Sequence, residues 1–204
     1  MNISTRHRRV TRVLGSTAVV GALAMIGYGM LAVLFPYPRI AQGISFELVW
    51  VVANVGVIAG IAGWAMTSGA RPRTLALAGA GLAVLGHAAR IVVGLWSVGP
   101  WPVSEADATW AIVATIPPAF LGMILLGIAT LVGRGPRDPQ AWVPLVTVAA
   151  GLVAASLYGT NTVAHFIVLG VGWGTAWLLL GLALRRLPEG PARAVPLTTA
   201  TTSS

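Results

Sequence analysis

Residues 74–98 read TLALAGAGLAVLGHAARIVVGLWSV, an apolar stretch that contains one formal charge, Arg90, with His87 about one helical turn before it. A helix of this length crosses the ~30 Å hydrocarbon core of a membrane. At ~1.5 Å per residue, Arg90 lies about 12 Å from the Val98 end. An arginine at that depth costs roughly 2.5–3.5 kcal/mol on insertion scales and normally faces the bundle interior, where it finds a partner. We therefore interpret the stretch as a membrane span that carries a polar site.

The composition is that of a membrane protein throughout. Of 204 residues, 56% are hydrophobic and 9% charged, with a mean hydropathy of +0.84, whereas a soluble domain is about 25% charged. No polar stretch is long enough for a second folded domain, so we expect one integral membrane domain over residues 13–186. Residues 1–12 form a basic N-terminal segment, and residues 187–204, rich in Pro, Ala, Thr and Ser, are expected to be a disordered tail.

Six apolar stretches predict six membrane-spanning helices and hence an all-α, polytopic bundle. Each is long enough to cross the membrane as a helix, and the fifth is the shortest. Pro117 and Pro118 fall near the middle of the fourth stretch, where they remove backbone donors and are expected to kink the helix. The predicted spans cover residues 13–35, 46–66, 74–98, 108–132, 142–158 and 163–184.

The arginines predict how the helices cross the membrane, because loops on the cytoplasmic side are enriched in arginine and lysine. On the other side the predicted loops hold Arg39 alone, together with the acids Glu47, Glu105 and Asp107. We therefore expect both termini in the cytoplasm and a location in the plasma membrane, and the bias towards Arg, Ala, Gly and Val is typical of a bacterial genome of high GC content. The cytoplasmic arginines are Arg6, Arg8, Arg9, Arg12, Arg71, Arg73, Arg134, Arg137, Arg185, Arg186 and Arg193.

The residue inventory argues against several chemistries. The net charge of +8 and the pI near 11.7 do not indicate nucleic-acid binding, because the arginines lie in short loops rather than on one basic face. Cysteine and lysine are absent, which removes disulfides, thiolate metal ligands and Schiff-base chemistry. Two span histidines at different depths favour neither a zinc site nor bis-histidine haem. We therefore expect no metal site and no cofactor.

Small and aromatic residues indicate how the bundle packs. Gly56 and Gly60 form a GxxxG pattern in the second span, for which close helix packing within the bundle is the expected use. Trp173 and Trp177 lie deep in the sixth span and are interpreted as bulky packing or lipid-contacting residues.

Five polar residues from three spans are predicted to meet in the outer half of the membrane. Glu47 and Asn54 share one face of the second span, and His87 and Arg90 share one face of the third. His165 lies about one turn into the sixth span from the same side. Together they would place a carboxylate, an amide, a guanidinium and two imidazoles around one outward-facing pocket.

Two interpretations of Arg90 are open at this point. In the functional one, Arg90 binds an anionic group with its planar guanidinium, Glu47 balances the charge, and His87 or His165 moves protons near neutral pH. In the structural one, Arg90 pairs with Glu47, or with carbonyls freed at a helix break, and locks two spans together. Burial does not separate the two, because Arg90 needs a partner in either case.

The basic loop after the fourth span reads LLGIATLVGRGPRDPQAWVPL (residues 125–145), and the sixth span closes with GVGWGTAWLLLGLALRR (residues 170–186). These two segments resemble a broad group of uncharacterised bacterial membrane proteins with six spans. The resemblance implies the six-span architecture and no reaction. His87 and Arg90 lie outside both segments.

The expected function is non-catalytic: binding of a small amphiphile, or support of a partner membrane protein, through the pocket of Glu47, Asn54, His87, Arg90 and His165. The alternative is a membrane-embedded enzyme that acts on a lipid or isoprenoid, with Glu47 and a histidine as acid and base. A small transporter that works as a dimer comes third, because the chain shows little sign of an inverted repeat. The bilayer and an oligomer of the chain are further partners compatible with this interpretation, whereas nucleic acid is not.

Overall fold

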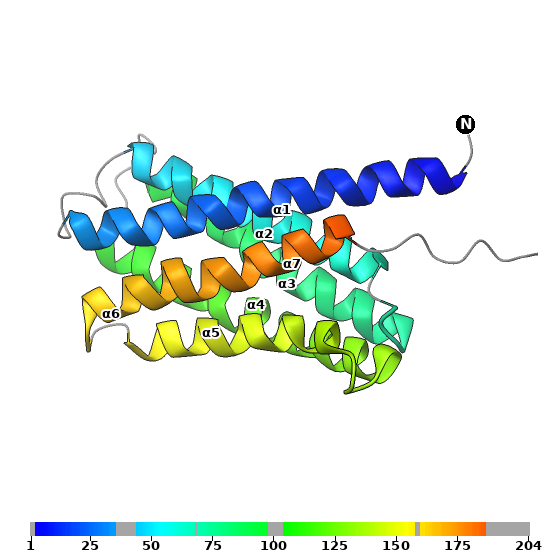
Figure 1. Ribbon diagram of the computed structural model, residues 1–204. Coiled ribbons are helices and arrows are strands. Elements are labelled where there is room, and N and C mark those ends of the chain that lie inside the picture. The colour runs from blue at the N-terminus through cyan, green and yellow to red at the C-terminus, as the bar shows by residue number, and fades with distance from the viewer. Residues whose placement is uncertain (1–2, 36–43, 68, 98–103, 158–159, 187–204) are drawn as a thin grey trace, which may run out of the picture.

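The computed structural model describes residues 3–35, 44–67, 69–97, 104–157 and 160–186. These residues form helices joined by short connections, as the all-α prediction requires (Figure 1). The predicted tail at residues 187–204, Arg39 and the side chain of Glu105 lie outside the described part. The elements are α1 (Ile3–Leu34), α2 (Ile44–Thr67), α3 (Arg73–Ser97), α4 (Glu105–Arg134), η1 (Pro139–Trp142), α5 (Val143–Leu157), α6 (Thr162–Ile167), η2 (Val168–Trp173) and α7 (Gly174–Arg186).

Six helices of the described chain are long and apolar enough to cross a membrane, which confirms the predicted six-span bundle. The sixth runs without interruption through α6, the π-helix η2 and α7. The first helix begins at Ile3, well before the predicted start of the apolar run at residue 13, so most of the basic N-terminal segment extends the first helix. The spans are Arg9–Leu34, Glu47–Thr67, Arg73–Trp96, Thr109–Arg134, Pro139–Leu157 and Thr162–Arg186.

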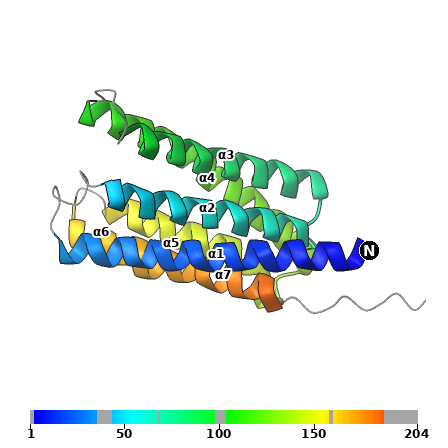
Figure 2. The same cartoon turned by 90° about the horizontal axis from the view of Figure 1, so that it is seen from above.

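The helices run roughly along one common direction and divide into two groups around α2. On one side of α2, α3 and α4 pack against each other as a hairpin, and on the other side α1 packs along both α2 and α7 (Figure 2). Helix α5 contacts α4, η2 and α7. Side chains on the outer faces, such as Leu85, Val132 and Leu179, are apolar and exposed. Apolar residues therefore cover both the interior and the surface, as a bilayer requires.

Glycines allow the closest helix contacts. Gly21 of α1 faces Gly56 of α2, and a Cβ atom added to Gly56 would lie 2.8 Å from the nitrogen of Gly21. Gly29 of α1 faces Gly170 of η2, where an added Cβ on Gly170 would lie 2.7 Å from the Cα of Gly29. Gly60 packs against the side chains of α7. The expected close packing of the GxxxG glycines within the bundle is therefore confirmed. The Gly21–Gly56 and Gly29–Gly170 contacts join α1 to α2 and to η2 through backbone atoms.

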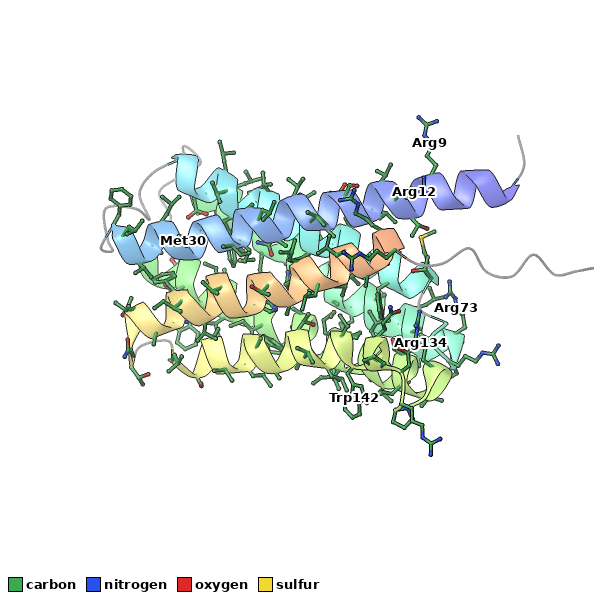
Figure 3. All side chains as sticks on the ribbon, in the orientation of Figure 1. Arg9, Arg12, Met30, Arg73, Arg134 and Trp142 are labelled. Carbon is green, nitrogen blue, oxygen red and sulfur yellow. The ribbon has the colours of Figure 1, made fainter. Side chains whose placement is uncertain are left out.

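Figure 3 shows Arg9, Arg12, Arg73 and Arg134 at the end of the bundle that holds the start of α1, here called the arginine end. Arg73 Nη1 donates to the carbonyl of Ala65 at 2.5 Å, which satisfies a carbonyl in the last turn of α2. Arg134 lies with its guanidinium 5.6 Å from the ring centre of Trp64. Its Nη1 donates to Asp138 Oδ2 at 2.7 Å and to Gln140 Oε1 at 3.0 Å, which fixes the short connection between α4 and η1.

Asp138, which lies between two spans, is expected to titrate below its ordinary value. The hydrogen bond from Arg134, together with the one from the backbone N–H of Gln140, lowers the pKa of its carboxyl from 3.8. Because the folded pKa lies below the unfolded one, the contact contributes its full stability above pH 3.8 and loses it as the pH falls through the lowered pKa. NMR titration of the Asp138 carboxyl in detergent measures this, and Arg134→Gln should move the pKa back up. A pKa at or above 3.8 in the native protein would contradict the described contact.

Candidate functional site

The site begins with a hydrogen bond between the second and third spans. Asn54 is fully buried in α2, and its Nδ2 donates to the carbonyl of Trp50 at 2.9 Å. The amide oxygen of Asn54 therefore faces His87, whose Nδ1 lies 2.9 Å away. Since an amide oxygen only accepts, this network assigns the ring hydrogen of His87 to Nδ1 and leaves a lone pair on Nε2. His87 is thereby held in one tautomer inside the bundle.

Arg90 lies one turn further along α3 and is only 6% exposed. Its Nε donates to Thr115 Oγ1 of α4 at 2.9 Å. The Thr115 hydroxyl donates in turn to the carbonyl of Ile112 at 2.6 Å, so it faces Arg90 with a lone pair. The Arg90 guanidinium carbon also lies 6.0 Å from the ring centre of Trp173. The partners of this cation in the described structure are thus a neutral hydroxyl and an aromatic ring.

Helix α4 continues through Pro117 and Pro118, just after the threonine that holds Arg90. The two prolines lack the N–H groups that would bond the carbonyls of Val113 and Ala114. Within the described residues no hydrogen bond joins Arg90 to either freed carbonyl, the contact that one form of the structural interpretation required. Instead, Arg90 Nε donates to the side chain of Thr115, which lies just before Pro117 in α4.

A cavity lies beside His87 and Arg90. The part of it that admits a water molecule is about 10 Å³, roughly the room for one water. Trp173 and Trp177 close it from the sixth span, where the His87 ring stacks at 6.1 Å on Trp173 and meets Trp177 edge-on at 6.3 Å. The wall consists of His87, Arg90, Ala119, Phe120, Met123, Thr147, Val148, Trp173 and Trp177.

The π-helix η2 sets the position of one wall of this cavity. Residues Val168–Trp173 form a π-turn inside an otherwise α-helical span, a local widening that recurs at functional sites. It ends at Trp173, and its Gly170 packs directly against Gly29 of α1. Trp173 and Trp177 are 5% and 1% exposed, so they are packing residues, as expected, and they also line the cavity beside Arg90. Lipid contact, the other expectation, is wrong for both.

Glu47 lies near the site but does not pair with Arg90. A Cβ added to Gly94, one turn beyond Arg90 on α3, would lie 3.2 Å from Glu47 Oε2, so the carboxylate points at that part of α3. Within the described residues, however, the ion pair found at 4 Å or less joins Arg134 to Asp138, and none joins Glu47 to Arg90. The predicted structural lock between the second and third spans is instead the Asn54–His87 hydrogen bond.

His165 lies apart from the other histidine. Its Nδ1 is 2.7 Å from the carbonyl of Ala154 in α5, and its ring meets Phe166 edge-on at 5.0 Å. It is not part of the cavity wall. The structure therefore brings together Asn54, His87 and Arg90 of the five predicted residues, sets Glu47 beside them, and uses His165 to join α6 to α5.

The described residues contain no group of three His, Cys, Asp or Glu side chains that could hold a metal ion. A scan against protein-family models finds no match for this chain, and searches of characterised proteins and of solved structures find none either. The function must therefore be argued from the site itself.

Two double-mutant cycles compare the ion pair that was considered for Glu47 and Arg90 with the hydrogen bond that joins Asn54 to His87. Glu47→Ala and Arg90→Ala should be additive within about 0.5 kcal/mol, because no ion pair joins the residues. Asn54→Leu and His87→Leu should instead couple by about 0.5–3 kcal/mol, since each leaves a buried partner unsatisfied. Unfolding of the four single and two double variants in detergent gives both numbers. Strong coupling between Glu47 and Arg90 would restore the ion-pair interpretation.

Proposed function

We propose that this membrane protein binds a small amphiphile in the cavity beside His87 and Arg90. One observation carries the proposal: Arg90 is a buried cation in a membrane span whose partners, in the described structure, are the Thr115 hydroxyl and the Trp173 ring. An intramembrane charge is costly and is usually neutralised by an opposite charge. A ligand that supplies the missing negative charge explains why the chain carries this arginine.

The remaining wall of the cavity supports a ligand with an apolar part. Ala119, Phe120 and Met123 of α4 and Val148 of α5 offer hydrocarbon surface beside the charged group. Neighbouring side chains on the outer side of α5, such as Val146, are exposed and face the surroundings of the bundle. Since the cavity has room for about one water molecule, the proposal places only the polar end of the ligand there, and the apolar part lies along the exposed apolar side chains outside the cavity.

We further propose that the arginine end faces the cytoplasm of a bacterial cell and that the bundle lies in its plasma membrane. The gathering of Arg9, Arg12, Arg73 and Arg134 at one end supports this orientation, because cytoplasmic loops are enriched in arginine. Arg90 then lies nearer the outer face, about 10 Å from the Ser97 end of α3 at ~1.5 Å per residue. Acid–base catalysis with Glu47 has less support, because Glu47 is not on the cavity wall.

A cavity-filling variant tests the binding proposal. Dodecyl-chain amphiphiles should raise the unfolding temperature of the native protein in nanodiscs, because a ligand that binds only the folded state stabilises it by mass action. Val148→Phe fills the cavity from α5 and should abolish the rise. Val146→Phe places the same ring on the exposed side of α5, where it should leave the rise unchanged. An equal rise in both variants would place binding outside this cavity.

A further inference from the structure

The arginine end carries cations that no described acid balances. Arg12 of α1 and Arg185 of α7 are both exposed. Within the described residues no carboxylate lies within 4 Å of either side chain, and Asp138, the described acid at this end, is bonded to Arg134. Exposed cations without a counter-charge in the chain attract anions from outside it.

These two arginines come together where α1 packs against α7, two helices that lie side by side (Figures 1 and 2). A Cβ added to Gly15 would lie 3.0 Å from Arg185 Cγ and 3.1 Å from the carbonyl oxygen of Gly181, so the stem of Arg185 passes over Gly15. Arg12 lies one helical turn before Gly15, where residues of one helix are surface neighbours. Arg9, one turn further, points away from the bundle (Figure 3).

The two arginines lie at the level of the lipid head groups. A helix crosses the ~30 Å hydrocarbon core with about 20 residues. Counted back from Leu34, where α1 ends, about 20 residues reach Gly15. Arg12 therefore lies about 5 Å beyond the core at ~1.5 Å per residue. Because the stem of Arg185 passes over Gly15, it enters the same layer from α7.

Towards the membrane centre, the surface below the two arginines is apolar. Leu23 and Met30 lie roughly three and five turns after Arg12 at ~3.6 residues per turn, hence on the same side of α1. Their side chains are 55% and 53% exposed. Leu178 lies roughly two turns before Arg185 on α7 and is half-buried. We call this surface of Arg12, Leu23, Met30, Leu178 and Arg185 the α1–α7 flank.

We propose that the α1–α7 flank binds an anionic phospholipid, with its phosphate held by Arg12 and Arg185 and its acyl chains lying along Leu23 and Met30. Guanidinium groups bind phosphate oxygens through two parallel hydrogen bonds, and basic sites between membrane helices bind anionic head groups. A zwitterionic lipid fits less well, because its ammonium group cancels the phosphate charge and is repelled by the arginines. This site is separate from the cavity beside Arg90 and does not rest on the ligand proposed there.

Titration of short-chain lipids in an uncharged detergent tests the proposal, because the micelle adds no surface charge of its own. Dioctanoylphosphatidylglycerol and dioctanoylphosphatidylcholine are titrated against the unfolding temperature of the full chain in dodecyl maltoside. The anionic lipid should act at a concentration at least ~10-fold lower, as expected for charge-assisted contacts. Glycerophosphoglycerol carries the same phosphate diester without acyl chains, and it should give no response at that concentration.

Three arginine variants locate the site. Arg12→Gln and Arg185→Gln should each weaken the response to the anionic lipid at least ~10-fold and leave the response to the zwitterionic lipid unchanged. Arg9→Gln removes the same charge from the same helix at a side chain that points away from the bundle, and it should weaken the response less than ~3-fold. All three side chains are exposed, so the lipid-free variants should unfold at the native temperature.

Each other outcome overturns a defined part of the proposal. Equal action of the two lipids overturns the preference for an anionic head group. Glycerophosphoglycerol as effective as the anionic lipid overturns the lipid and leaves an anion site. An effect of Arg9→Gln as large as that of Arg12→Gln overturns the site and leaves a diffuse basic surface. Val148→Phe, which fills the cavity, should leave the anionic lipid response unchanged, and its loss there would place the lipid beside Arg90 instead.

Discussion

Replacement of Arg90 by methionine is expected to weaken the binding of dodecanoate, an anionic dodecyl-chain amphiphile, by at least ~30-fold. The ligand-free variant should be as stable as the native protein within about 1 kcal/mol. Removing one member of a buried charge pair costs 2–5 kcal/mol or more in binding, and about 1.4 kcal/mol is tenfold in affinity. In the ligand-free protein the change removes an unbalanced charge, which raises stability by roughly 2.5–3.5 kcal/mol on insertion scales. It also removes the hydrogen bond to Thr115 and the contact with Trp173, which lowers stability. These gains and losses nearly cancel.

The stability of the ligand-free protein is what separates the two interpretations of Arg90. Breaking a buried ion pair that holds two spans together costs about 3–5 kcal/mol, and a loss of that size in Arg90→Met would make the residue structural. Arg73→Met is the control, because Arg73 lies at the arginine end and donates to the carbonyl of Ala65. It should leave dodecanoate binding unchanged. Chemical unfolding and ligand titration in the same nanodiscs give both quantities for each variant.

The second large effect is expected at Gly56. Gly56→Ala should destabilise the bundle by about 2 kcal/mol or more, because the added Cβ falls 2.8 Å from the nitrogen of Gly21 and 2.9 Å from the carbonyl oxygen of Thr17. These neighbours are backbone atoms, so they cannot turn aside as a side chain would. Helices α1 and α2 must separate, and the loss of packing spreads along both.

Gly81→Ala is the matched control for Gly56. It lies in α3, and an added Cβ would meet nothing within 4 Å. Alanine is the better helix former by up to ~1 kcal/mol, so this variant should be neutral or more stable than the native protein. Unfolding of both variants in the same detergent compares them directly. Equal stability of the two would mean that α1 and α2 do not approach as closely as described.

The spans could be predicted from the sequence because the bilayer imposes one length and one polarity on every crossing helix. Boundaries differ where that constraint ends, as at Ile3, where the basic start of α1 continues the helix outside the apolar run. The grouping of Asn54, His87 and Arg90 was also predictable, since helical periodicity places polar residues of one span on one face. Each of these residues needed a partner within the bundle, and facing polar stripes supply it.

The rest of the site depends on which helices are neighbours, and periodicity within one span does not determine this. Thr115 lies in an apolar span, and its role follows only from the packing of α4 against α3. Trp173 and Trp177 line the cavity through the packing of the sixth span. That span contains the π-turn Val168–Trp173, which the residues of the segment do not predict. His165 was expected in the same pocket because it lies near the outer end of the sixth span, whereas its Nδ1 contacts the carbonyl of Ala154 in α5.

The contact between Gly29 and Gly170 has a consequence for how the protein is made. Membrane helices enter the bilayer in the order of their synthesis, so α1 is inserted long before the segment that it packs against in η2. Until that segment arrives, Arg90 lacks the Trp173 ring and the cavity lacks its indole wall. In an incomplete chain Arg90 therefore has the Thr115 hydroxyl of α4 as its described partner. The cavity therefore forms late, only when the sixth span has docked, and a chain that lacks this span does not contain it.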